Sequence, residues 1–346
     1  MKIKSKKFMS NLITYGIVIA AFILVNVFYG DMSRSLRGQL VPICVYVVMA
    51  ISLNLTVGIS GELSLGHAGF MSVGAFSGIV MSGWLLSAFQ MENEVVRLIL
   101  SMLVGGVFAG LAGVLIGIPV LRLRGDYLAI VTLAFGEIIR NVINCIYISA
   151  DGATLHFAFS NPNIPGTVLL NGPNGAVGVD KIATFAMGFA LVLFTLFVVL
   201  NLINSRSGRA IMAIRDSRIA AESVGLNITK YKMMAFVTSA VLAGMAGALY
   251  GLNSATVVAS KFRFDTSILV LVFVVLGGIG NIRGSIIAAT VLTVLPEMLR
   301  AFSDYRMLVY AIVLIFVMLA TNTPFAKNLW RRIFHRHAEE KEGEAA

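Results

Sequence analysis

Charged residues are scarce in this sequence. Of its 346 residues, 13% are Asp, Glu, Lys or Arg and 58% are hydrophobic, with a mean hydropathy of +0.88. A typical soluble domain is about one quarter charged, because it must cover its core with a polar surface. The composition therefore excludes a soluble globular protein and predicts that most of the chain lies in a lipid bilayer.

Several features on which chemistry usually depends are also missing. The two cysteines, Cys44 and Cys145, fall in apolar segments without metal-ligand spacing, so neither a disulfide framework nor a zinc site is predicted. No Gly-x-x-x-x-Gly-Lys-Ser/Thr run occurs, which excludes a phosphate-binding loop in this chain. Paired acids, or a nucleophile with its base, are not recognisable either. We expect a protein that is not an enzyme and carries no cofactor or metal of its own.

Apolar runs of about 20 residues recur along most of the sequence, and a helix of that length matches a hydrocarbon core of about 30 Å. A transmembrane β-barrel would instead show alternating segments of about ten residues. We predict an all-α integral membrane protein, a polytopic helical bundle of about ten transmembrane helices (range 8–10). The predicted spans are residues 9–29, 39–58, 64–83, 98–121, 127–148, 182–202, 233–253, 267–280, 285–301 and 307–321. In the lower counts, residues 58–70 or 267–284 are re-entrant segments.

Positive charge gives the chain a net +10. In a membrane protein such an excess is typical of cytoplasmic loops, so nucleic-acid binding is not expected. With ten spans, most of the 27 Lys and Arg residues lie on the side of both termini, which predicts an N-in/C-in topology. The basic N-terminus resembles a signal peptide, but no small-residue cleavage site follows it, so we expect an uncleaved first span. The predicted parts are a cytoplasmic segment (1–8), a transmembrane domain (9–322) with an external loop (149–181) and a cytoplasmic loop (203–232), and a cytoplasmic tail (323–346).

The cytoplasmic loop at residues 203–232 alternates apolar and basic residues. Its pattern predicts two short helices, with Asp216 capping the second and Gly225 ending it in the left-handed conformation. Ala220 and Ala221 would be exposed between charged neighbours. Such a knob suits insertion into a groove on another protein, although a basic loop that only fixes the topology would have the same composition.

Glycine and serine are dense between residues 58 and 83. Glycine at this density either lets helices pack closely or permits broken helices whose ends bind polar solutes. The second interpretation makes four residues candidates for a solute pathway: Ser64, Gly66, His67 and Gly69. The first leaves them as packing residues, with His67 satisfied by a neighbouring backbone carbonyl.

Two charges lie within the predicted fifth span. Glu137 and Arg140 are three residues apart and therefore share one helical face. Because an unpaired charge is costly in a membrane, we predict an ion pair, which either fixes helix packing or rearranges as a gate.

Separately, residues 109–117 and 243–251 share Gly-x-x-x-Gly spacing. We interpret these two runs as packing faces, with an inverted internal repeat as the alternative.

The run from Arg215 to Lys232 resembles the cytoplasmic coupling loop of ABC-importer permeases, whose signature is Glu-Ala-Ala followed by a glycine. This chain departs from that signature with Ala220-Ala221-Glu222 and then Gly225, as do the branched-chain amino acid permeases of the LivM subfamily. Further runs resemble this family in the same order: 64–70, 121–132, 135–140, 171–175 and 277–281. The likeness covers residues 40–322.

The resemblance implies one subunit of a heteromeric importer in a bacterial inner (cytoplasmic) membrane. Its partners would be a homologous permease, two cytoplasmic ATP-binding subunits that hydrolyse ATP with magnesium, and an external solute-binding protein. The residues coupling the chain to the ATPase would be Arg215, Asp216, Ala220, Ala221, Glu222 and Gly225. Leucine, isoleucine and valine are the expected solutes. Urea, short amides or sugars, carried by related importers, are the alternative, and an ion-coupled secondary transporter is a further one.

Overall fold

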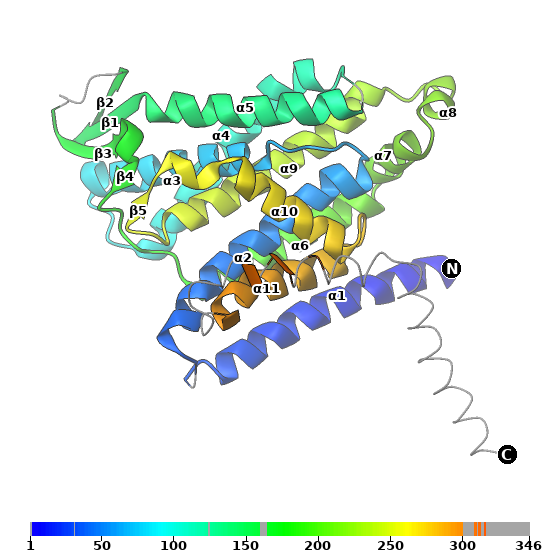
Figure 1. Ribbon diagram of the computed structural model, residues 1–346, viewed down its shortest axis with the longest axis horizontal. Helices are drawn as coiled ribbons and strands as arrows, with labels where there is room; N and C mark the ends of the chain where they lie inside the picture. The colour runs from blue at the N-terminus through cyan, green and yellow to red at the C-terminus, as the bar shows by residue number, and fades with distance from the viewer. Residues whose placement is uncertain are drawn as a thin grey trace. The chain divides into compact units, whose positions relative to one another are not determined.

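The computed structural model describes residues 2–30, 32–123, 125–159 and 165–299, with a few isolated positions between 308 and 315 (Figure 1). Contacts divide the chain into two units, Met1–Thr293 and Val294–Ala346. Most of the predicted tenth span and all of the predicted tail lie outside the described residues.

Long helices form at each of the other predicted spans. They are α1 (Lys2–Val27), α2 (Arg34–Asn54), α3 (His67–Phe89), α4 (Glu94–Val120), α5 (Asp126–Asn144), α6 (Phe185–Asn204), α9 (Ile228–Gly251), α10 (Phe264–Gly277) and α11 (Ile282–Met298). Within the described residues, six helices are long and apolar enough to cross a membrane, counting α2 together with the π-helical turn Leu55–Ile59 that continues it. The predicted helical membrane protein is confirmed. The 14 residues of α10 rise only about 21 Å, too little for a straight crossing.

Helices α3, α4 and α9 pack through glycine. A Cβ on Gly74 of α3 would lie 2.4 Å from the Cα of Gly244 in α9, and a Cβ on Gly244 would lie 2.3 Å from the Cβ of Ala109 in α4. Contacts this close need the absence of a side chain. The two Gly-x-x-x-Gly runs therefore serve packing, as predicted, and they meet each other where α4 crosses α9.

The prediction of an all-α chain is wrong between residues 146 and 177. There, β1 (Ile146–Asp151), β2 (Thr154–Phe159) and β3 (Thr167–Asn171) form an antiparallel sheet in the order β2-β1-β3. A two-residue turn joins β1 to β2, with Asp151 paired to Thr154. The predicted fifth span overran into β1 because Ile146-Tyr-Ile148 continues the apolar run of α5 after its end at Asn144.

A second, smaller sheet ties two distant segments together. Strand β4 (Ala176–Val177) pairs with β5 (Thr256–Val257), which follows α9. Short 3-10 turns adjoin these strands at Gly172–Asn174 and Ala259–Phe262. The predicted external loop is thus a folded structure, and the Nε1 of Trp84 in α3 donates to the carbonyl of Ala153 in it at 3.0 Å.

The loop predicted to be cytoplasmic folds into α7 (Arg206–Asp216) and α8 (Arg218–Ser223). Figure 1 shows α7 and α8 at one end of the helices and the β1–β3 sheet at the other. The two long loops therefore lie at opposite ends of the helices, as the predicted topology requires.

Candidate coupling and translocation site

The α7–α8 pair, called here the knob (residues 206–225), begins each helix at a serine. Ser205 accepts a hydrogen bond from Gly208 N at 3.0 Å, and Ser217 accepts one from Ala220 N at 3.4 Å. The prediction that Asp216 caps α8 is wrong, because Ser217 has the extended backbone of an N-cap residue. Asp216 instead accepts from its neighbour Arg215, at 3.0 Å from Nε and 2.9 Å from Nη2.

Gly225 ends α8 as predicted, with a φ of +80°. The next amide, Leu226 N, donates to the carbonyl of Ala221 at 3.0 Å, and Leu226 packs against a small core formed with Ile214 and Ile228. This arrangement is a Schellman-type helix end, in which glycine adopts the left-handed conformation without a Cβ penalty. The short helix α8 therefore has a defined boundary.

The two alanines of the knob differ in exposure. Ala220 is exposed as predicted, but Ala221 is only 3% exposed because it belongs to the small core. The apolar surface of the knob is formed by Ile219, 82% exposed, and Val224, 74% exposed. The sequence analysis missed both residues, although a helical projection of α8 that places Ala221 inward would have turned Ile219 outward.

The knob contacts the end of α2. Arg215 Nη1 donates to the carbonyl of Gly58 at 2.8 Å, and a Cβ on Gly61 would lie 2.7 Å from Arg215 Cγ. Lys232, in the second turn of α9, forms an ion pair with Glu62, and these side chains are 13% and 12% exposed. A cleft of about 340 Å³ lies between the knob and the residues that follow α2. Its lining includes Ser60, Leu63 and Arg218.

A non-helical connection, called here the break, joins the two candidate spans α2 and α3. After the π-helical turn Leu55–Ile59, residues 60–66 are not helical, and α3 begins at His67. Gly58 is required at the break because a Cβ there would lie 1.9 Å from Asn54 Oδ1 and 2.3 Å from Gly280 N. The packing interpretation of the glycine-rich stretch is therefore confirmed for its later glycines, whereas residues 60–66 join two separate candidate spans and the solute-binding interpretation stays a prediction.

His67 is buried at the start of α3, with 2% of its surface exposed. Its Nε2 lies 2.8 Å from Ser52 Oγ, so a hydroxyl, and not the expected backbone carbonyl, is its partner. The next amide, Ala68 N, donates to Ser267 Oγ of α10 at 3.0 Å. The N-terminus of α3 is thus held by side chains from α2 and α10.

The other predicted pathway residues lie beside α5. Leu65 N donates to Thr132 Oγ1 at 3.0 Å, and Gly66 is so close to Thr132 that a Cβ would lie 2.2 Å from its carbonyl oxygen. Gly69 faces Gly136 in the same way, at 3.0 Å. Ser64 is buried, and its hydroxyl has no hydrogen-bond partner among the described residues, nor do the hydroxyls of Ser60 and Ser72.

Asn54 is a buried polar residue that the sequence analysis missed. Its Nδ2 donates to Ser285 Oγ at 2.8 Å, and its Oδ1 accepts from Gly280 N at 2.9 Å. These bonds fix the break after α2 against the glycine turn that joins α10 to α11. An amide inside an apolar span was the available signal, because such a group needs partners when buried.

Glu137 and Arg140 form the predicted ion pair, with Arg140 Nε 2.7 Å from Glu137 Oε2. Both side chains are partly exposed on α5. Within the described part of the chain, no hydrogen bond joins this pair to His67 or its partners. The pair therefore has no hydrogen-bonded link to the buried polar cluster, by which we mean His67, Ser52 and Ser267 around the start of α3.

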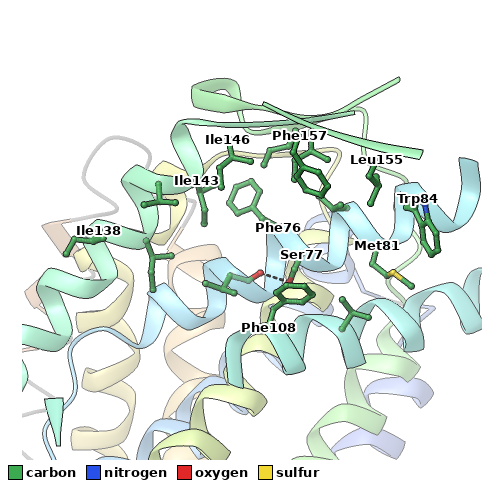
Figure 2. Close-up of a pocket in the computed structure, with 17 residues that line it drawn as sticks. Phe76, Ser77, Met81, Trp84, Phe108, Ile138, Ile143, Ile146, Leu155 and Phe157 are labelled. Atoms are coloured by element: carbon green, nitrogen blue, oxygen red, sulfur yellow. Dashed lines mark hydrogen bonds between the residues drawn. The ribbon is translucent and has the colours of Figure 1, made fainter. Parts of the chain in front are cut away.

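A cavity of about 470 Å³ lies between α3, α4, α5 and the β1–β3 sheet (Figure 2). Aromatic side chains such as Phe76, Phe108 and Phe157 line it. The hydroxyl of Ser77 at its wall donates to Val73 O within its own helix at 2.6 Å. Because a charged solute group would find no partner in such a lining, this cavity is poorly suited to an amino acid zwitterion.

Candidate metal ligands do not cluster in the described residues: no group of three His, Cys, Asp or Glu side chains is placed to bind an ion. The polar elements of the site are hydroxyls, one imidazole, one amide and the ion pair between Glu62 and Lys232. Such a set of hydroxyl, imidazole and amide groups can offer hydrogen bonds to a polar solute.

Relatives of known name resemble this chain over most of its length. One relative is the "high-affinity branched-chain amino acid transport system permease protein LivM" of Salmonella typhimurium, which is 33% identical over 309 residues. The match covers 80% of this chain and 66% of the relative, so this chain spans slightly less than two thirds of the relative's length. The "fructose import permease protein FruG" of Bifidobacterium longum is 24% identical, covering 79% of this chain and 78% of the relative. The permease LivH of Salmonella typhimurium is 31% identical over a shorter stretch, 41% of this chain and 44% of its own.

No solved structure matches this chain. The model of one protein family matches residues 35–318, which include every helix from α3 to α11, the broken segment and the knob. On this match, the chain belongs to the family described as the permease component of branched-chain amino acid transport systems.

Proposed function

We propose that this chain is the membrane-spanning permease subunit of an ATP-driven importer that moves leucine, isoleucine and valine across a bacterial cytoplasmic membrane. The observation that carries this proposal is the family match over residues 35–318, together with the 33% identity to LivM. The lower identity to FruG, 24% over a similar length, favours amino acids over sugars.

In the proposed topology about ten helices cross the membrane, with both termini in the cytoplasm. The knob at one end of the helices and the sheet at the other support this arrangement. So does the placing of Arg122 between α4 and α5, of Arg283 in the first turn of α11, and of the basic residues in the knob itself.

The knob would dock on a cytoplasmic ATP-binding subunit. Ile219 and Val224 supply exposed apolar surface at its tip, and Arg218 pairs with Glu222 beside them, 3.3 Å apart. An apolar centre with a charged rim is the usual composition of a protein interface. The predicted coupling residues Arg215, Asp216, Ala220 and Gly225 would shape this surface, whereas Ala221 would support it from within.

A homologous permease would pair with this chain, so that two knobs meet two ATP-binding subunits. The partial likeness to LivH supports such a partner, because two related permeases can form one pseudo-symmetric pair. An external solute-binding protein would dock at the end that carries the β1–β3 sheet.

The solute would pass near the break between α2 and α3. The buried hydroxyls of Ser60, Ser64 and Ser72, which have no partner among the described residues, support this placement because buried polar groups are normally hydrogen-bonded. His67, Gly66 and Gly69 would shape the wall of this path, while Glu137 and Arg140 would hold α5 as a static pair.

Purification and reconstitution would test the proposal. The tagged chain should co-purify with a second permease and ATP-binding subunits in mild detergent. Proteoliposomes that contain this complex and its binding protein should accumulate labelled leucine with ATP and fail to do so with a non-hydrolysable analogue. Accumulation that follows an ion gradient and ignores ATP would contradict it.

A further inference from the structure

Two separate contacts join the segment after α2 to helices α7 and α9. The first is the hydrogen bond from Arg215 of α7 to the carbonyl of Gly58, at 2.8 Å. The second is the ion pair between Glu62 and Lys232 of α9. Because they come from different helices and use different chemistry, they hold the segment at two points.

The ion pair is not an ordinary surface pair. The side chains of Glu62 and Lys232 are 12% and 13% exposed, whereas Arg218 and Glu222 on the knob are 38% and 54% exposed. Exposed pairs contribute little because water screens them, but removing one partner of a buried pair leaves an uncompensated charge. Removing either Glu62 or Lys232 should therefore cost more free energy than removing one partner of the exposed pair between Arg218 and Glu222.

The same segment leads directly to the buried polar cluster. Four residues after Glu62, Gly66 packs on Thr132 of α5, and His67 then bonds to Ser52. Residues 60–66 form no regular helix, so no ladder of helical hydrogen bonds fixes their backbone. A displacement of the knob can therefore reach the start of α3 through the non-covalent contact of Arg215 with Gly58 and the short stretch of chain from there to His67.

We propose that Glu62 and Lys232 form a coupling latch, a pair of positioning residues through which movement of the knob is transmitted to the break between α2 and α3. This inference rests on the proposed function of the chain as a permease driven by ATP-binding subunits. The hydrogen bond from Arg215 to the carbonyl of Gly58 is the second contact that holds this segment against the knob. Loss of the latch leaves the knob docked and ATP hydrolysed, but uncouples hydrolysis from passage of the solute.

The test uses the reconstituted complex with its binding protein, and the measured quantity is leucine accumulated per ATP hydrolysed. Glu62→Gln and Lys232→Met should each lower this ratio by about 2- to 30-fold, the range expected for coupling free energies of 0.5–2 kcal/mol. The exchange variant Glu62→Lys with Lys232→Glu should recover most of the loss, which a merely destabilised protein would not do. Lys230→Met, which removes an exposed positive charge from the same end of α9, is the matched control and should keep the wild-type ratio.

Unchanged ratios in both single variants would overturn the latch while leaving the permease assignment intact. A wild-type complex without ATP-driven leucine uptake would instead contradict the proposed function, so a second measurement tests the latch by itself.

Ser60→Cys, in a chain lacking Cys44 and Cys145, places a thiol in the non-helical segment between α2 and α3, where Ser60 is 3% exposed. Addition of nucleotide to the complex should change its labelling rate, and Lys232→Met should abolish that change. A rate that responds equally in both chains, or in neither, excludes the latch.

Discussion

Glycines at which a Cβ does not fit determine how closely α3, α4 and α9 approach. We expect Gly74→Leu to destabilise the fold, because even a Cβ at this position would overlap the Gly244 backbone. Overpacking of this kind costs about 1–3 kcal/mol, and the apparent melting temperature of the purified protein should fall. Gly38→Ala is the control, since nothing lies within 4 Å of a Cβ there. Equal melting temperatures for the two variants would contradict close packing at Gly74.

Gly225 allows a test of backbone conformation without a steric clash, because a Cβ built on it meets nothing within 4 Å. Its φ of +80° disfavours a β-branched residue, and a left-handed backbone costs an L-residue about 1–2 kcal/mol. We expect Gly225→Val to loosen the end of α8 and to reduce both co-purification of the ATP-binding subunits and ATP-driven uptake. Gly225→Asn, which tolerates this conformation better, should retain more of both. Full uptake by the valine variant would show that the knob is not the coupling element.

Sequence reasoning at this scale succeeded where a residue's own chemistry dictates its role. The left-handed glycine at 225 and the pair between Glu137 and Arg140 follow from local spacing alone. It failed where the neighbours decide. Ser217, and not Asp216, caps α8, and Ala221 is buried because Ile214 and Ile228 approach it from other helices.

Among the elements, the break between α2 and α3 was one of two readings of a glycine-rich stretch. Composition alone could not select between packing and a broken helix, because the contact that requires Gly58 comes from Gly280, far along the chain. The β1–β3 sheet was missed for a different reason. Its first strand is apolar and follows α5 after one residue, so helix and strand merge into one hydrophobic run.

The opposite placement of the knob and the sheet predicts their accessibility in cells. In a chain without Cys44 and Cys145, we expect Thr154→Cys on β2 to react with an impermeant maleimide added to intact cells. Ser223→Cys on α8 should react only after the membrane is opened, because the proposed topology places the knob in the cytoplasm. Both positions are exposed, and Ser223 is preferred to Ser217 because Ser217 caps its helix. Labelling of Ser223→Cys from outside would reverse the topology.

For the whole molecule, division of labour among subunits follows from what this chain contains. It has an exposed knob, a non-helical segment with buried hydroxyls between two spans, and a folded sheet, but its sequence has no phosphate-binding loop. In the proposed complex the energy comes from a partner subunit, and the knob is the element that would receive it. Membership of the family was readable from separated motifs in order, whereas the route from knob to pathway required the contacts of residues 58–62.

The choice of solute is the last prediction and belongs to the assembled complex. In vesicles that contain the complex and its binding protein, unlabelled valine and isoleucine should compete with labelled leucine, while urea and fructose should not. The polar groups near the break, Ser60, Ser64 and Ser72, are uncharged hydroxyls, which can pass a zwitterion along through weak contacts and would not retain it as a tight site would. The same vesicles without ATP give the background. Inhibition by fructose with valine inert would place the chain closer in function to FruG than to LivM, and would leave the permease architecture unchanged.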